Sequence, residues 1–182
     1  MADKDQAGHG SAAGNQASRL AVIAIGSNIG DTLSYVRGAV AAIAALPGIS
    51  VQKVSSLYQT EPAHVKDQDV FTNAVMTVLV DDSVSALELL HRLQAIETDF
   101  HRVRHEHWGP RTLDLDIIDI AGEISDTEEL RIPHPYALLR DFVVSPLLEI
   151  EPDYVLADGK PVSHEAVEYG FVISVNDFGS NG

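Results

Sequence analysis

The stretch Val70-Phe71-Thr72-Asn73-Ala74-Val75-Met76-Thr77-Val78-Leu79-Val80 is rich in valine and threonine and contains neither glycine nor proline. Such residues favour extended backbone, so the stretch predicts a β-strand over 70–80. Three further runs, at Leu20–Ile25, Val51–Tyr58 and Thr112–Ile120, also predict strands. The first of them, short and rich in isoleucine and valine, is typical of a buried strand.

Two helical patterns lie between these strands. The first follows Asp31 or Thr32, either of which can cap its N-terminus, and it ends at Pro47-Gly48. The second follows Ser83 or Ser85, and Ser85 with Glu88 fits a capping box. Both have apolar residues at intervals of three or four, as an amphipathic helix requires. These are Leu33, Val36, Val40, Ile43 and Leu46 in the first, and Leu87, Leu90, Leu93, Ile96 and Phe100 in the second.

The element order β-α-β-β-α-β predicts an α+β fold of the ferredoxin-like type, a sandwich of helices on an antiparallel sheet. The two helices should cover one face of the sheet and leave the other for substrate. A hairpin or loop, a helical turn near Tyr136–Leu139 and a C-terminal segment should follow. A chain of 182 residues suits one domain. We place it at residues 19–178, between a disordered tail (1–18) and a frayed end (179–182).

Charge and composition exclude several classes of partner. The formal net charge is −15, which repels nucleic acid phosphates and anionic lipid headgroups. No apolar run reaches the roughly 18–20 residues that span a bilayer. The chain contains no cysteine, so disulfides and thiolate metal sites are excluded. We therefore expect a cytoplasmic protein that binds neither nucleic acid nor membrane. We expect a monomer, and an oligomer is the alternative that the sequence leaves open.

Basic residues gather in one stretch of this acidic chain. They are Arg102, Arg104 and Arg111, which are 3 of the 12 Lys+Arg, together with His101, His105 and His107. One interpretation is an ordinary solvated face, and the other is a site for anions such as phosphate. Gly109-Pro110 would let such a loop close over a site as a lid.

Asp114 and Asp116 interrupt an otherwise apolar predicted strand. Alternate strand residues point the same way, so the two carboxylates should share a face, roughly 6–7 Å apart at the backbone. Like charges in this position need a counter-ion, and Mg²⁺ with its preference for carboxylate and phosphate oxygens would supply one. A solvated strand face is the alternative. Asp119 has the opposite parity and is expected at the strand end rather than as a ligand.

The turn Gly26-Ser27-Asn28-Ile29-Gly30 follows the first strand and invites comparison with phosphate-binding loops. It lacks both the Lys-Ser/Thr ending of a Walker A loop and the Gly-x-Gly-x-x-Gly pattern. We interpret it as a plain strand-to-helix turn.

The stretch His107-Trp108-Gly109-Pro110-Arg111-Thr112-Leu113-Asp114-Leu115-Asp116 closely resembles the signature of the hydroxymethyldihydropterin pyrophosphokinases. Further segments agree in order and spacing, so the resemblance covers roughly residues 20 to 155. They are Ala24-Ile25-Gly26-Ser27-Asn28, Ser55-Ser56-Leu57-Tyr58-Gln59-Thr60-Glu61-Pro62, Phe71-Thr72-Asn73-Ala74, Pro133-His134 and Arg140-Asp141-Phe142.

The resemblance implies a ferredoxin-like enzyme that uses two Mg²⁺ ions to transfer diphosphate from ATP to a reduced pterin. It implies that Asp114 and Asp116 bind the metal and are catalytic together with Arg102 and Arg111. The implied ATP-binding residues are Gln94, Glu97, Arg104, His107, Trp108, Ile117, His134 and Arg140. The implied pterin-binding residues are Thr60, Glu61, Ala63, Phe71, Asn73, Trp108 and Phe142, with Phe71 and Phe142 on either side of the ring.

Four positions depart from the pattern that this family usually shows. His107 stands where many members have arginine, so a titratable group replaces a permanent charge. Phe71 stands where tyrosine is frequent, which keeps the ring and loses a hydroxyl. Glu61 replaces a common proline, and Ala63 a larger apolar residue.

As a hypothesis, the pterin hydroxyl attacks the β-phosphorus of ATP and AMP leaves, while metal and arginines neutralise the transferred group. The sequence offers no obvious general base. Three other readings remain at this stage: a pterin- or nucleotide-binding module without turnover, a ferredoxin-like interaction domain without a ligand, and a polymerase or nuclease. Chain length and the −15 charge disfavour the last of these.

Overall fold

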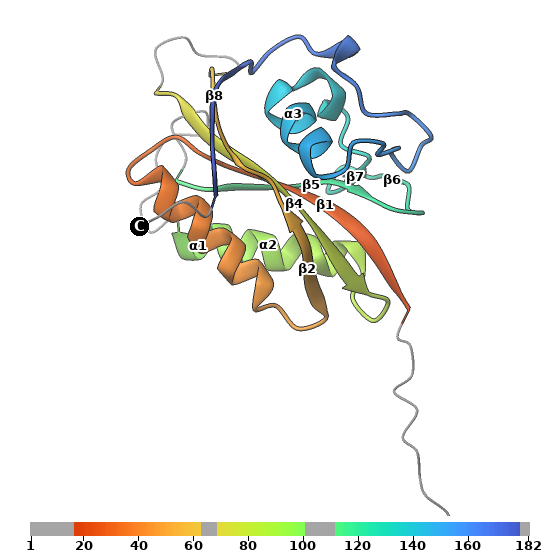
Figure 1. Cartoon of the computed structure of the whole chain (residues 1–182). Helices are drawn as coiled ribbons and strands as arrows, with labels where there is room; N and C mark the ends of the chain where they lie inside the picture. The colour runs from red at the N-terminus through yellow and green to blue at the C-terminus, as the bar shows by residue number, and fades with distance from the viewer. Residues whose placement is uncertain (1–16, 63–68, 101–111, 179–182) are drawn as a thin grey trace, which may run out of the picture.

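A six-stranded antiparallel sheet runs through the computed structural model, which describes residues 17–62, 69–100 and 112–178 (Figure 1). The strand order is β5-β1-β4-β3-β8, and β2 pairs with β4 as well. The elements are β1 (Ser18–Ser27), α1 (Thr32–Ala44), β2 (Ile49–Val54), β3 (Leu57–Thr60), β4 (Phe71–Asp81), α2 (Ala86–Phe100), β5 (Asp114–Ile120), β6 (Ser125–Asp126), β7 (Arg131–Ile132), η1 (Ala137–Leu139), α3 (Asp141–Ile150), η2 (His164–Ala166) and β8 (Val172–Asn176).

The predicted β-α-β-β-α-β order is confirmed, and so is the helical turn near 136–139, now η1. Residues 1–16 and 179–182 of the predicted ends lie outside the described residues, but Ser18, the last residue of the predicted tail, already belongs to β1. One predicted strand, 51–58, is two strands. Ser55 separates them, because its N–H donates to the Val75 carbonyl (2.8 Å) and its Oγ accepts from the Val75 N–H (2.9 Å).

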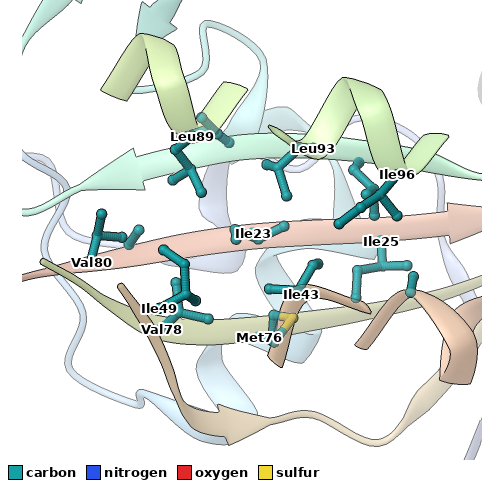
Figure 2. Close-up of a cluster of buried hydrophobic side chains, with 14 of the residues drawn as sticks. Ile23, Ile25, Ile43, Ile49, Met76, Val78, Val80, Leu89, Leu93 and Ile96 are labelled. Carbon is teal, nitrogen blue, oxygen red and sulfur yellow. The ribbon is translucent and has the colours of Figure 1, made fainter. Parts of the chain in front are cut away.

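The main core lies between one face of the sheet and helices α1 and α2 (Figure 2). Alternate residues of the central strand β1, including Ile23 and Ile25, point into it and are buried. Removing a side chain of this size from water contributes about 1.5–3 kcal/mol. The helices contribute Val36, Ala39, Ile43, Leu89, Leu93 and Ile96 to the same core.

The buried stripe of α2 differs from the predicted one. Leu89 is fully buried, whereas Leu87 is 41% exposed. Residues two positions apart in an α-helix lie roughly 200° apart around its axis, so Leu87 and Leu89 cannot both face the sheet. At the helix start the Ser85 Oγ accepts from the Glu88 N–H (3.1 Å), as predicted, but the Glu88 carboxylate pairs with Arg92 (2.8 Å).

The opposite face of the sheet was predicted to be free for substrate, and this prediction is wrong in part. A second apolar cluster joins Val22, Ala24, Val75 and Ile118 of the sheet to α3 and η1. Helix α3 lies on the far side of the sheet from α1 and α2 (Figure 1). It was missed because Val143-Val144 favours extended backbone and Pro146 lies inside the helix.

A carboxylate fixes α3 above the sheet. Glu149 accepts two contacts from the Ser56 N–H (3.0 and 3.1 Å) and one from the Tyr58 hydroxyl (2.7 Å). Burial of the phenol, together with this carboxylate, raises the pKa of Tyr58 well above its usual range. The end of α3 is therefore held at the point where β2 gives way to β3.

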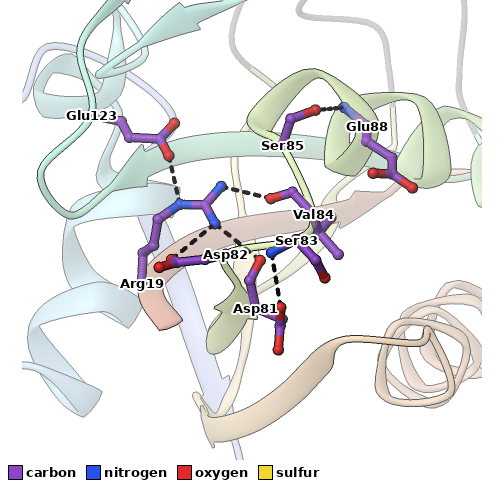
Figure 3. A network of polar contacts seen from close by, with 8 residues as sticks. All are labelled: Arg19, Asp81, Asp82, Ser83, Val84, Ser85, Glu88 and Glu123. Carbon is purple, nitrogen blue, oxygen red and sulfur yellow. Dashed lines mark hydrogen bonds and ion pairs between the residues drawn. The ribbon is translucent and has the colours of Figure 1, made fainter. Parts of the chain in front are cut away.

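A second polar network surrounds Arg19 near the start of β1 (Figure 3). The Arg19 guanidinium donates to the carbonyls of Asp81 (3.1 Å) and Val84 (2.8 Å) and pairs with Glu123. These contacts tie β1, the turn between β4 and α2, and the residues after β5. In the described parts of the chain no helix is long and apolar enough to cross a membrane.

The two leucines of α2 provide a test of this core. Leu89→Ala should lower the free energy of unfolding by about 2–5 kcal/mol, because it leaves a cavity between helix and sheet. Leu87→Ala should lower it by less than about 1 kcal/mol, because the side chain is already partly in water. Urea denaturation of both variants measures this difference. Equal losses would mean that α2 is rotated relative to the sheet.

Candidate functional site

The site is built on one row of the sheet that crosses four strands. Asp114 of β5 pairs with Gly26 of β1, Gly26 pairs with Asn73 of β4, and Asn73 pairs with Tyr58 of β3. Two residues further along β5, Asp116 pairs with Ala24, and Ala24 pairs with Val75. Directly paired residues of neighbouring strands point to the same face. The row therefore places a carboxylate and an amide on one face, two strands apart.

Asp114 and Asp116 lie on the face that α3 partly covers. Their neighbours Leu113, Leu115 and Ile117 are buried in the core with α1 and α2, and side chains alternate along a strand. Both aspartates are half-buried. The predicted shared face of the two carboxylates is therefore confirmed.

Asp119 was predicted to have the opposite parity, and a β-bulge overturns that expectation. Val22 pairs with Asp119 and Ile23 with Ile117, so Ile118 is an extra residue in β5. The bulge turns Asp119 to the side of α3. There it is fully buried and accepts from the Tyr154 hydroxyl (2.7 Å) and the Ala157 N–H (3.1 Å). Burial raises the pKa of Asp119 above its ordinary value, against the effect of these hydrogen bonds.

His134 is bonded to the bulge through its backbone, and its ring interacts electrostatically with Asp116. The backbone N–H of His134 donates to the carbonyl of Ile118 (2.8 Å), and the ring Nδ1 of His134 accepts from the backbone N–H of Tyr136 (3.2 Å). Burial lowers the pKa of His134, Asp116 opposes this shift and Arg140 adds to it. At neutral pH the ring is therefore uncharged and carries its proton on Nε2.

Asn73, at the other end of this row, and the nearby Thr60 provide polar side chains on the same face. Asn73 is buried, and its Nδ2 donates to Thr60 Oγ1 (2.6 Å). Thr60 pairs with Phe71 in register, so these three predicted pterin residues lie together on one face. In the described part of the chain, the carbonyl oxygen and the second N–H of the Asn73 side chain have no hydrogen-bonding partner.

Gly26 allows the amide to lie flat over β1. A methyl group at this position would lie 2.8 Å from Asn73 Oδ1 and 4.0 Å from a ring carbon of Phe71. The sequence marked Gly26 only as a turn residue, because nothing in a single strand indicates which side chain of the neighbouring strand lies across it.

Phe142 and Arg140 approach from the start of α3. The Arg140 guanidinium carbon lies 5.5 Å from the ring centres of Phe142 and Tyr136 and 5.9 Å from that of Tyr169. Its Nε donates to the Tyr169 hydroxyl (2.9 Å). Tyr169 was not predicted at all, since a tyrosine in an irregular segment gives no signal of what it contacts.

Three further residues predicted to bind ATP lie on α2 or have side chains in the main core. Glu97 of α2 accepts from the Leu115 N–H (3.2 Å), beside the carboxylate strand, and Gln94 is exposed on the same helix. The side chain of Ile117 is buried among α1 and α2, so the structure does not bring it to the carboxylate face.

Glu61 is exposed, and its N–H donates to the Phe171 carbonyl (3.0 Å). The remaining predicted residues lie outside the described residues: Ala63, Arg102, Arg104, His107, Trp108 and Arg111.

The donor set on this face fits a hard divalent cation that is shared with a substrate. Within the residues described, no three His, Asp or Glu side chains gather as a closed metal cage. Asp114 and Asp116 place two half-buried carboxylates on this face. Mg²⁺ typically takes one or two protein carboxylates and completes its shell with water and phosphate oxygens.

The fold and the site define a ferredoxin-like domain with a carboxylate pair and an aromatic-and-amide site on one sheet face. The family model of 7,8-dihydro-6-hydroxymethylpterin-pyrophosphokinase matches residues 22–152. The 2-amino-4-hydroxy-6-hydroxymethyldihydropteridine pyrophosphokinase of Bacillus subtilis is 45% identical over 133 residues, 73% of this chain and 78% of the relative. That of Pseudomonas aeruginosa is 39% identical over 138 residues, 76% and 84% of the two chains.

This chain belongs to the 7,8-dihydro-6-hydroxymethylpterin-pyrophosphokinase family. The fold agrees with a crystal structure of wild-type Plasmodium falciparum HPPK-DHPS with pterin and p-hydroxybenzoate, at a TM-score of 0.56 and 12% identity. The match covers 86% of this chain and 42% of that chain, so this protein spans less than half of the solved one.

The buried Asp119 should give the protein a measurable pH dependence. Its pKa is raised in the folded state, so its contribution to stability is complete below the unfolded value and is lost as pH rises through the folded value. Wild type should therefore gain stability relative to Asp119→Asn when pH falls from about 7 to about 4. Urea denaturation of both proteins at the two pH values measures this. A difference that is constant, or that shrinks at low pH, would contradict the shift.

Proposed function

We propose that this protein transfers the diphosphate of ATP to the hydroxymethyl group of 6-hydroxymethyl-7,8-dihydropterin, releasing AMP, as a step of folate biosynthesis. The observation that carries the proposal is the Asp114–Gly26–Asn73 row. It joins a carboxylate suited to a phosphate-bound cation to an amide suited to a flat heterocycle. Membership of the pyrophosphokinase family supports the same reaction.

In this proposal Asp114 and Asp116 hold Mg²⁺, two ions as the family resemblance implies. The ions supply positive charge that neutralises the transferred phosphoryl groups and acidifies the pterin hydroxyl when they are bound. The two carboxylates lie two residues apart on one face of β5, at the edge of the sheet, which puts both within reach of one polyphosphate chain. Arg102 and Arg111, the other proposed catalytic residues, would neutralise the remaining charge.

The pterin would be held by the other end of the row. The carbonyl oxygen and second N–H of the Asn73 side chain, which no other described residue bonds, offer the acceptor and donor that a pterin edge requires, and Thr60 fixes the orientation of that amide. Phe71 and Phe142 would lie on the two faces of the ring. Glu61, Ala63 and Trp108 complete the proposed pterin residues.

The nucleotide would be held by charged and polar groups around the carboxylates. His134 lies close to Asp116 and Arg140, and its neutral ring offers an Nε2–H donor. Arg140 adds a permanent positive charge. The other proposed ATP-binding residues are Gln94, Glu97, Arg104, His107, Trp108 and Ile117, the last through its backbone.

The reaction needs one bond formed and one broken. The pterin hydroxyl oxygen attacks the β-phosphorus, the bond from that phosphorus to the α–β bridging oxygen breaks, and AMP leaves with the oxygen. The hydroxyl proton passes to water. The protein's part is to orient the hydroxyl in line with the leaving group and to keep charge neutralised. The cytoplasmic location and the monomeric state stay predictions.

Loss of one metal carboxylate tests the reaction. Asp116→Asn should reduce pterin-dependent AMP release by at least about a hundredfold, because the charge that holds the cation is removed. Asp126→Asn is the matched control, since that side chain is 90% exposed and lies outside the site, and it should retain full activity. Release of AMP is followed with purified protein, ATP, Mg²⁺ and reduced pterin. A wild-type protein that binds both substrates without releasing AMP would instead be a binding module.

The amide of Asn73 tests how the pterin is recognised. Asn73→Ala should raise KM for the pterin at least about tenfold and leave KM for ATP unchanged, because only the pterin would lose hydrogen bonds. Gln52→Ala, at an exposed amide on β2, should change neither value. Steady-state kinetics with each substrate varied in turn give both constants. A rise in KM for ATP alone would place Asn73 on the nucleotide side.

A further inference from the structure

We propose that Tyr169, which lies outside the residues matched by the family model, is a positioning residue that orients Arg140 toward the nucleotide. This inference rests on the proposed function. Tyr169 belongs to a short segment, Glu168–Val172, which we call the C-terminal strap. The family match ends at residue 152, so the strap is a part of this chain that the match does not cover.

Arg140 is held by Tyr169 in two ways. The guanidinium Nε donates to the Tyr169 hydroxyl (2.9 Å), and the guanidinium carbon lies 5.9 Å from the centre of the same ring. A guanidinium has five N–H donors in a planar fork, and fixing Nε fixes the plane of the others. Among the described residues, the four terminal N–H groups of Arg140 have no hydrogen-bonding partner. They are the donors that can bind phosphate oxygens.

The backbone keeps Tyr169 in place beside this arginine. The carbonyl of Tyr169 accepts from the Asp141 N–H (3.0 Å), and its N–H donates to the Leu139 carbonyl (3.2 Å). The Asp141 carboxylate also accepts from the Val172 N–H (2.9 Å) and from the Ser145 hydroxyl. The strap is therefore bonded to the residues on both sides of Arg140, so the backbone that carries the tyrosine ring is held beside the arginine.

The strap also touches the pterin side of the site. Gly170 has a φ of +69°, and a methyl group there would lie 2.3 Å from a ring carbon of Phe142, so the ring rests directly on the glycine. One residue further, the Phe171 carbonyl accepts from the Glu61 N–H. The strap thus supports both an aromatic residue proposed for the pterin, through Gly170, and an arginine proposed for ATP, through Tyr169.

Removing the Tyr169 hydroxyl tests the hydrogen bond that it accepts from Arg140. Tyr169→Phe should lower kcat/KM for ATP about tenfold, because a charge-assisted hydrogen bond is lost. KM for the pterin should stay unchanged, since Phe142 and Gly170 are untouched. Tyr154→Phe is the matched control. It removes another hydrogen-bonded phenol hydroxyl from the same C-terminal part of the chain, but its partner is Asp119. It should lower stability and leave both kinetic constants as in wild type.

Two measurements test the inference without turnover. Affinity for a non-hydrolysable ATP analogue, measured by calorimetry, should fall about tenfold in Tyr169→Phe. In ¹⁵N-labelled protein, the Nε–H signal of Arg140, assigned by its loss in Arg140→Lys, should exchange with water faster in Tyr169→Phe than in wild type. Unchanged analogue affinity, or unchanged exchange, would overturn the positioning role. A wild-type protein that releases no AMP but shows both effects would overturn the proposed reaction and leave the role of Tyr169 standing.

Discussion

The site depends on strict alternation of side chains along β5. Leucine and isoleucine at 113, 115 and 117 are buried against the two helices, and this burial forces the aspartates between them to the opposite face. A shift of one residue in register would exchange the two sets and put two carboxylates into an apolar core, which is very costly. The hydrophobic core on one face therefore fixes the position of the charges on the other.

The β-bulge at Ile118 interrupts this alternation two residues after Asp116. With the extra residue, Asp119 turns toward the α3 side, where Tyr154 and the Ala157 N–H stabilise it. The carbonyl of the bulged residue also receives the His134 N–H, which places an uncharged imidazole next to Asp116. A local irregularity of one strand thus separates a structural carboxylate from two that face the site, although only two residues lie between Asp116 and Asp119.

The sequence was sufficient for the element order and for the shared face of Asp114 and Asp116, because both follow from local periodicity. Phe71, Asn73 and Thr60 could be grouped through the family resemblance and the parity of one strand. The bulge at Ile118, the burial of Leu89 in place of Leu87, and α3 could not be predicted. Each depends on contacts between distant segments: the pairing of β5 with β1, the rotation of α2 on the sheet, and apolar residues on both faces of β1. Tyr169 was missed for the same reason, since its partner lies 29 residues earlier in the chain.

The strap has a thermodynamic consequence for substrate binding. It is bonded to Arg140 on the one hand and to the backbone of Glu61 on the other. The conformational entropy of this segment is therefore lost when the chain folds, and neither substrate spends binding free energy on ordering it. Contacts that a substrate makes with groups held by a preorganised segment appear more fully as affinity.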